Sequence, residues 1–285
     1  MQDLVRIKKL GIEREGLSVI EDLNLVLRED EVLGIMGPSG VGKTSLLRCL
    51  VAPGEVTWME SEQLLFAGKA RKERDISVGY VPQSGGLFPW ATVLQNLELS
   101  QIPSGETDIP ALAKALFPRL CLPLRILGKY PDEISGGERK RASIARALVG
   151  RPDLLLLDEP LGNLDPGIRL QCQELLGEYF RSIKGVLLVT HDIEEVIYLC
   201  DRVVVISGEP ARIQLELRVP AARPRKHSFR DSEECRDLVR ELRLLLLASD
   251  EGDSRTHPSL IPGGGRVTSS TSSMGEEAVE KRRAH

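Results

Sequence analysis

The sequence predicts an α/β fold built around a mainly parallel sheet, and two patterns carry that prediction. Short apolar runs, each long enough for one buried strand, alternate with helical segments in the second half of the chain. The apolar runs lie at 154–157, 186–189 and 203–206, and the helical segments at 137–148, 168–183 and 193–199. Such alternation is typical of a parallel sheet covered by helices on both faces. The second pattern is a glycine-rich turn between an apolar run at 32–36 and a helix that begins at Thr44.

This turn follows the pattern of a phosphate-binding loop, in which a glycine, four further residues and Gly-Lys-Ser/Thr connect a strand to a helix. Its residues are Gly37, Pro38, Ser39, Gly40, Val41, Gly42, Lys43 and Thr44, followed by Ser45. Glycines let backbone N–H groups point at phosphate oxygens, and the helix N-terminus adds partial positive charge. We expect Lys43 to reach the β- and γ-phosphates and the Thr44 hydroxyl to bind Mg²⁺. A chance lysine beside a glycine turn is disfavoured by this order and context, so the sequence predicts a P-loop nucleoside triphosphatase.

Composition restricts the class of protein further. Of 285 residues, 41% are hydrophobic, and 38 Lys and Arg against 42 Asp and Glu give a net charge of −4, which argues against a nucleic-acid partner. The five cysteines include no CxxC pair, so neither metal-site spacing nor a disulfide framework is expected. The longest leucine runs, 154–157 and 244–247, are too short to cross a membrane, and the N-terminus lacks the apolar core of a signal peptide. We therefore expect a soluble protein unless a partner holds it at a membrane.

Residues 1–207 are predicted to form the main domain. Before the phosphate loop, short apolar runs at 4–7, 17–20 and 23–27 alternate with charges and predict strands joined by polar turns, an antiparallel β subdomain. Glycines and prolines break the segment at about 84–134 into short helices. This segment is predicted to be a small α-helical insert in the α/β core.

Residues 208–247 are predicted to be a C-terminal extension. The alternating residues 213–217 resemble an edge strand, and 232–247 an amphipathic helix. The apolar face of that helix contains Leu238, Leu242, Leu245 and Leu246. From 248 to 285 the composition turns to serine, threonine, glycine and charge, which predicts a disordered tail.

Two adjacent carboxylates, Asp158 and Glu159, follow the apolar run 154–157. The carboxyl ends of strands in an open α/β sheet are where such folds bind ligands. Asp158 is therefore expected to hold Mg²⁺, usually through water. Glu159 points the other way along the strand, and we expect it to act as general base on the attacking water.

A second anion site is expected at Ser135, Gly136, Gly137 and Glu138. Ser-Gly-Gly at a helix start offers backbone N–H groups and a hydroxyl. One chain has no spare phosphate for this site, so we expect it to bind the γ-phosphate held by another copy. The alternative is a plain helix N-cap.

With these motifs the chain resembles the ATPase subunits of ABC transporters. The matching segments, in the family's order and spacing, are 37–44, Gln83, 135–139, 158–159, 162–165 and 190–192. The resemblance implies ATP and Mg²⁺ as cofactors and a head-to-tail homodimer or paired ATPase subunit. It also implies that Gln83 contacts Mg²⁺ and the membrane partner, that Asp165 contacts the opposite subunit, and that His191 hydrogen-bonds the γ-phosphate during catalysis.

A finer resemblance concerns the nitrate/sulfonate/taurine-type importers, carried by 87–96, 191–205 and 208–213. It implies uptake of a small solute, transmembrane permease subunits, an indirect extracytoplasmic substrate-binding protein, and a peripheral location on the cytoplasmic face of the inner membrane. Two departures stand out. Glu138 replaces the usual glutamine, and no aromatic residue occurs before Trp58 to stack on adenine. The corresponding position is near Arg14, whose guanidinium is expected to stack on adenine unless the base is held loosely.

Three other functions remain open at this point. They are the ATPase of an exporter, a soluble ABC-type ATPase acting on DNA or ribosomes, and a degenerate regulatory module. The acidic balance and the short insert disfavour the second, and the intact Lys43, Asp158, Glu159 and His191 disfavour the third. The basic run 139–141 is expected to be a solvated helix face. The cargo is chosen by other subunits, so this sequence does not name it.

Overall fold

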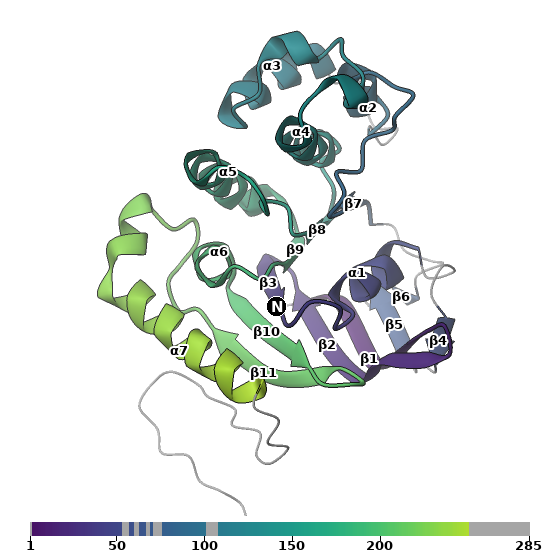
Figure 1. Ribbon diagram of the computed structural model, residues 1–285, viewed down its shortest axis with the longest axis vertical. Coiled ribbons are helices and arrows are strands. Elements are labelled where there is room, and N and C mark those ends of the chain that lie inside the picture. The colour runs from purple at the N-terminus through teal and green to yellow at the C-terminus, as the bar shows by residue number, and fades with distance from the viewer. Residues whose placement is uncertain are drawn as a thin grey trace, which may run out of the picture.

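The computed structural model describes residues 2–52, 57–59, 63–66, 69–70, 76–100 and 108–250. Within these residues the larger sheet has six strands: β3 (Glu31–Met36), β7 (Val78–Val81), β8 (Leu154–Asp158), β9 (Gly185–Val189), β10 (Arg202–Ser207) and β11 (Arg212–Arg218). Their order is β11-β10-β3-β9-β8-β7, and every neighbouring pair is parallel except the antiparallel pair β10 and β11. The predicted α/β class with a mainly parallel sheet is confirmed (Figure 1).

The smaller sheet is antiparallel. It contains β1 (Asp3–Arg14), β2 (Leu17–Arg28), β4 (Thr57–Met59), β5 (Gln63–Phe66) and β6 (Lys69–Ala70). The prediction of separate short strands at its start is wrong, because 17–20 and 23–27 belong to one continuous strand. The left-handed residues Lys9 (φ 49°) and Asp22 (φ 50°) and the register shifts between β1 and β2 explain this, since β-bulges let a strand continue through polar residues.

The predicted helices are confirmed within a few residues. They are α1 (Lys43–Val51), α2 (Val93–Glu98), α3 (Ile109–Arg119), α4 (Gly136–Val149), α5 (Pro166–Tyr179), α6 (Ile193–Leu199) and α7 (Glu233–Asp250). Figure 1 shows α2, α3 and α4 grouped together, away from α1, while α7 lies along β10 and β11. Residues 251–285 of the predicted tail lie outside the described residues. Among the described helices, none is both long and apolar enough to cross a membrane.

The larger sheet separates two hydrophobic clusters. In β8, Leu155 and Leu157 face the cluster that contains the residues of α4 to α7, and Leu154 and Leu156 face the cluster of α1 and the smaller sheet. Successive strand residues point to opposite faces, so a continuous leucine run serves both clusters. This burial holds the carboxyl end of β8, and with it Asp158, in a fixed place beside the loop that precedes α1 (Figure 1).

The C-terminal extension packs against the same core. The predicted edge strand is β11, at the border of the larger sheet. On α7, Leu238 and Leu242 are buried, and Leu245 and Leu246 are partly buried against the cluster of the parallel sheet. The predicted apolar face of this helix is therefore confirmed, and α7 covers one end of the sheet.

Candidate active site

The phosphate-binding loop requires glycine at two positions because the backbone is crowded there. A Cβ on Gly37 would lie 2.2 Å from the Ile206 carbonyl oxygen, on β10. Gly42 has a left-handed φ of 103°, and its Cβ would lie 2.8 Å from Val19 Cγ1. A side chain at either position would collide with a neighbouring strand, so the path of the loop depends on these glycines.

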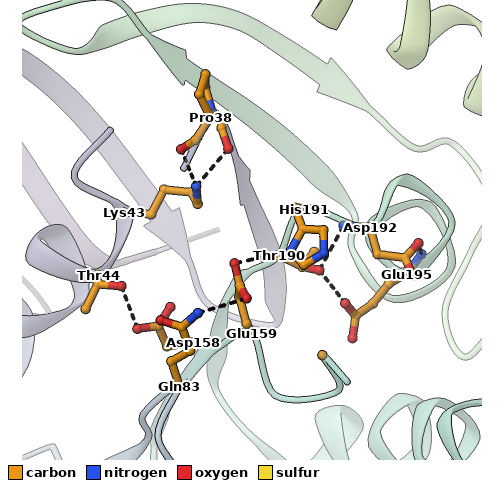
Figure 2. Close-up of polar contacts among 12 residues, drawn as sticks. Pro38, Lys43, Thr44, Gln83, Asp158, Glu159, Thr190, His191, Asp192 and Glu195 are labelled. Carbon is orange, nitrogen blue, oxygen red and sulfur yellow. Dashed lines mark hydrogen bonds and ion pairs between the residues drawn. The ribbon is translucent and has the colours of Figure 1, made fainter. Parts of the chain in front are cut away.

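Lys43 folds back over the loop (Figure 2). Its Nζ donates hydrogen bonds to the carbonyl oxygens of Gly37 at 2.7 Å and Pro38 at 2.6 Å. Burial lowers the pKa of this ammonium, while the charges of Glu159 and Asp158 raise it. The ammonium therefore lies inside the loop, at the position from which a phosphate oxygen could take over as its acceptor.

Thr44 and Asp158 form a hydroxyl–carboxylate pair across two elements. Thr44 Oγ1, in the first turn of α1, donates to Asp158 Oδ2 at 2.8 Å. Asp158 is buried, which raises the pKa of its carboxyl, while the hydrogen bond from Thr44 lowers it. Mg²⁺ commonly uses one or two carboxylates together with substrate phosphates, so this oxygen pair fits a Mg²⁺–triphosphate. Among the described residues no cluster of three or more metal-ligating His, Cys, Asp or Glu side chains occurs.

Glu159 joins two other predicted catalytic residues. Gln83 Nε2 donates to Glu159 Oε2 at 3.1 Å, and His191 Nδ1 lies 3.2 Å from Glu159 Oε1 (Figure 2). Gln83 follows β7, Glu159 follows β8 and His191 follows β9, three neighbouring parallel strands. Glu159 also has a left-handed φ of 47°. Few non-glycine residues adopt this conformation. Those that do are concentrated at functional sites, where the surrounding structure imposes the conformation.

The serine-glycine-glycine segment caps a helix that lies elsewhere in the fold. Ser135 Oγ accepts from the Glu138 N–H at 3.2 Å, and Glu138 Oε2 accepts from the Ser135 N–H at 2.9 Å and the Ser135 hydroxyl at 2.8 Å. This capping box stabilises the start of α4 and, through hydrogen bonds from Ser135, lowers the pKa of Glu138. A Cβ on Gly136 would meet nothing within 4 Å, so the backbone is open here. One copy does not bring this segment to its own phosphate loop, because α4 lies apart from α1 (Figure 1).

Asp165 is the N-cap of α5, and its Oδ1 accepts from the Gly167 N–H at 2.9 Å. This bond fixes the start of α5, after the turn that follows β8. The predicted contact of Asp165 with an opposite subunit involves a second chain and stays a prediction.

A cavity of 910 Å³ adjoins the phosphate loop. Its lining includes Leu17 and Val19 of β2, Pro38 to Val41 of the loop, and Ser207 to Pro210 after β10. Arg14, the expected adenine contact, is not among the lining residues, and its guanidinium is 3.9 Å from Glu15 in solvent. Leu17 lies instead at the mouth of this cavity, with 72% of its surface exposed. Sequence reasoning missed Leu17 because it searched only for an aromatic residue or a cation.

The basic run at 139–141 was expected to be solvated, and this expectation is wrong for two of its residues. Arg141 is buried, and Lys140 is half-buried with its Nζ donating to the Gly162 carbonyl oxygen at 3.1 Å. Another residue that sequence reasoning missed is Glu195, which is buried in α6 next to Thr190. The available signal was an acidic residue on the apolar face of a short helix.

Fold and site together define a P-loop nucleotide hydrolase. A model of the ABC transporter family matches residues 20–162. The aliphatic sulfonates import ATP-binding protein SsuB of Zymomonas mobilis is 37% identical over 225 residues, which cover 78% of this chain and 88% of that protein. The chain therefore belongs to the ABC transporter family of ATP-binding proteins, and its activity is ATP hydrolysis coupled to transport.

Two further comparisons are of the same kind. The taurine import ATP-binding protein TauB of Escherichia coli is 37% identical over 224 residues, covering 77% of this chain and 86% of that protein. Among solved structures, the dimeric ATP-binding cassette MJ0796, in a post-hydrolysis state bound to ADP and Pi, superposes with a TM-score of 0.67 at 24% identity. The match covers 76% of this chain and all of that one. At this identity it shows that the two proteins share a fold.

Proposed function

We propose that this chain is the ATP-hydrolysing subunit of an importer for aliphatic sulfonates, taurine or related small solutes. The observation that carries the catalytic part is the cluster in which Glu159 contacts both Gln83 and His191, next to the pair of Thr44 and Asp158. The cargo class is supported by relatives that are named for sulfonate and taurine import and are 37% identical over most of both chains.

In this proposal the triphosphate of ATP binds the loop 37–45, with Lys43 turning from the loop carbonyls to the β- and γ-phosphates. Thr44, Asp158 and Gln83 would hold Mg²⁺, which neutralises charge on the phosphates. The base occupies the cavity beside Leu17, whose apolar side chain replaces the absent aromatic stacking partner. Glu159 takes a proton from the attacking water, and His191 donates a hydrogen bond to the γ-phosphate.

The active unit in this proposal is a head-to-tail dimer. The loop of one copy and Ser135, Gly136, Gly137 and Glu138 of the other would enclose each ATP, with Asp165 at the contact between copies. The open backbone around Gly136 and the distance of α4 from α1 in one copy support this arrangement. The dimeric state of the structurally similar cassette agrees with it.

The surface near Gln83 is proposed as the contact with a permease pair. Trp90 has 70% of its surface exposed, its ring stacks on Phe88 at 4.9 Å, and the Arg146 guanidinium lies 4.3 Å from the Phe88 ring centroid. An exposed aromatic side chain such as Trp90, stacked on a partly buried one, is typical of protein–protein contacts. Binding there would place the chain on the cytoplasmic face of the cell membrane, and an extracytoplasmic binding protein would deliver the solute to the permease.

A pull-down of the tagged chain from its native membranes in mild detergent tests this proposal. We expect a multi-span permease to copurify, and a Trp90→Ala variant to lose it while keeping ATP binding. Recovery of ribosomes or DNA without a membrane protein would contradict the transporter assignment. If proteoliposomes that contain the chain and its permease transport solute only in the export direction, the exporter alternative would be favoured.

A further inference from the structure

Glu195 is a buried acidic residue that no step above uses. It lies in the first turn of α6 with 2% of its surface exposed, and the residues that follow it, Val196 to Leu199, are buried and mainly apolar. Its Oε1 is buried and has no hydrogen-bond partner among the described residues. A buried charge loses its hydration and is costly unless it is paired, so an ionisable group at such a position calls for a functional explanation.

The other carboxylate oxygen of Glu195 connects to the turn that carries His191. The Thr190 hydroxyl donates a short hydrogen bond to Glu195 Oε2, and Thr190 Oγ1 accepts from the Asp192 N–H at 3.1 Å (Figure 2). Asp192 in turn caps α6, accepting from the N–H groups of Glu194 and Glu195 at 3.0 and 3.1 Å. These bonds fix the residues on both sides of His191.

The surroundings of Glu195 bring its ionisation close to neutral pH. The pKa of this carboxyl is raised to about 7, mainly by burial, and the hydrogen bond from Thr190 opposes the rise. The charge of Asp192 also raises the pKa, while the charges of Arg169 of α5 and Lys140 of α4 lower it. Arg169 also pairs with Asp192 at 3.0 Å, and Lys140 holds the Gly162 carbonyl next to Glu159. Glu195 therefore faces groups from three elements that border the catalytic site.

We propose that Glu195 is a positioning residue whose ionised carboxylate holds the Thr190–Asp192 turn, and hence the His191 ring, in the arrangement needed for hydrolysis. This inference rests on the proposed role of His191. An ionised carboxylate can only accept, so it directs the Thr190 hydroxyl proton to itself and leaves an oxygen lone pair for the Asp192 N–H. A protonated carboxyl can instead donate to Thr190 Oγ1, which frees the Thr190 hydroxyl proton to turn to another acceptor and loosens the turn.

The variant Glu195→Gln tests this, because the amide keeps the shape of the side chain and cannot ionise. We expect its kcat at pH 8 to be about fivefold to twentyfold below that of the unmodified protein, with KM for ATP changed less than twofold. Since the amide resembles the protonated acid, the ratio of the two kcat values should approach one as the pH falls through about 7. Glu194→Gln, on the exposed side of the same helix turn, is the matched control and should leave kcat unchanged.

Thermal unfolding supplies a readout that a merely structural role would not give. A folded-state pKa raised to about 7 means that Glu195 favours folding below its unfolded pKa and that this contribution is lost as the pH rises through 7. Glu195→Gln should therefore raise Tm at pH 8 while lowering kcat, and the gain in Tm should disappear near pH 5. Should Glu195→Gln fold poorly, Thr190→Val removes the same link, and its kcat should show the same loss of pH dependence.

Two results would overturn the inference. One is a Glu195→Gln protein with the kcat and pH profile of the unmodified chain. The other is a Glu195→Gln protein with a lower Tm at every pH and a kcat that is reduced by the same factor at every pH. The variant His191→Ala shows whether only the positioning role of Glu195 fails or whether the proposed role of His191 in hydrolysis fails as well. If His191→Ala is inactive while Glu195→Gln is normal, only the positioning role fails, whereas a fully active His191→Ala would remove the role of His191 itself.

Discussion

Glu159 is held in place by both its side chain and its backbone. Its carboxylate contacts Gln83 and His191, and its backbone N–H donates to the Val189 carbonyl oxygen at 2.8 Å. That bond ties the end of β8 to β9 and holds the left-handed turn in which the residue follows Asp158. The carboxylate is thus directed to the loop by backbone geometry as well as by its two side-chain partners.

We predict that Glu159→Gln lowers ATP turnover roughly 10²–10⁴-fold, the usual effect of losing a general base, while ATP binding is retained. Steady-state hydrolysis and equilibrium binding of ATP, measured on the same preparation, check both parts. Near-normal hydrolysis would remove Glu159 from the role of general base.

Leu17 gives a second prediction at this scale, because its exposed side chain lies at the mouth of the cavity beside the loop. Leu17→Ala should weaken ATP binding roughly threefold to tenfold, the effect expected when about 40 Å² of apolar contact with the base is lost. Arg14→Ala is the control and should have no effect, since Arg14 does not line the cavity. The reverse pattern in a fluorescent-nucleotide titration would restore Arg14 as the adenine contact.

The positions of several site residues could be predicted from the sequence because their signals are local. The loop 37–44 and the pair of Asp158 and Glu159 each follow an apolar strand, so the strand predicts where the polar residues emerge. The capping box of Ser135 and Glu138 is also a local pattern, Ser-x-x-Glu, and corresponds to the plain N-cap that was the alternative to an anion site. Glu195 and Lys140 could not be assigned in this way, because their partners come from other elements.

Among the elements, α7 shows how the C-terminal extension contributes to the fold. It begins after the core strands are complete, yet its buried face joins the same cluster as the helices that flank the larger sheet. The amphipathic pattern predicted this face correctly. The contact of the face with the end of the sheet could not be predicted, because helical periodicity identifies a buried side but not the partner that covers it.

Leu242→Ala should lower the free energy of unfolding by about 2–4 kcal/mol, because Leu242 is fully buried and its removal leaves a cavity. Leu247→Ala in the same helix should cost less than about 0.5 kcal/mol, since that side chain is 58% exposed. Urea unfolding of the two variants makes the comparison. Equal losses of unfolding free energy in the two variants would mean that the buried face of α7 does not stabilise the fold more than its exposed face.

The β1–β2 pair illustrates a limit of sequence reasoning for elements. Polar residues at 21–22 interrupt the apolar pattern and predict a turn, whereas the chain passes through them as a bulge in one strand. A turn and a bulge both use polar residues and positive φ. They differ only in whether a neighbouring strand is present on both sides of the interruption, which depends on the tertiary fold.

At the scale of the whole molecule, the two predicted anion-binding motifs lie in different parts of the chain. The phosphate loop and Glu159 lie at the carboxyl edge of the larger sheet, and the cap of α4 lies with the helical insert (Figure 1). A second copy in head-to-tail orientation would complete each site. In this proposal, the second copy is the reason that the two motifs need not meet within one chain.

An ATP site shared between two copies is tested most directly by the molar mass of Glu159→Gln in solution. Light scattering measures this mass with and without Mg²⁺-ATP. Because this variant should bind ATP without hydrolysing it, we expect ATP to convert it from a monomer of 31.5 kDa to a species of twice that mass. ADP should leave it monomeric, and Ser135→Arg in the same background should abolish the conversion. A variant that stays monomeric with ATP bound, or that dimerises equally well with Ser135→Arg, would contradict an ATP site shared between two copies.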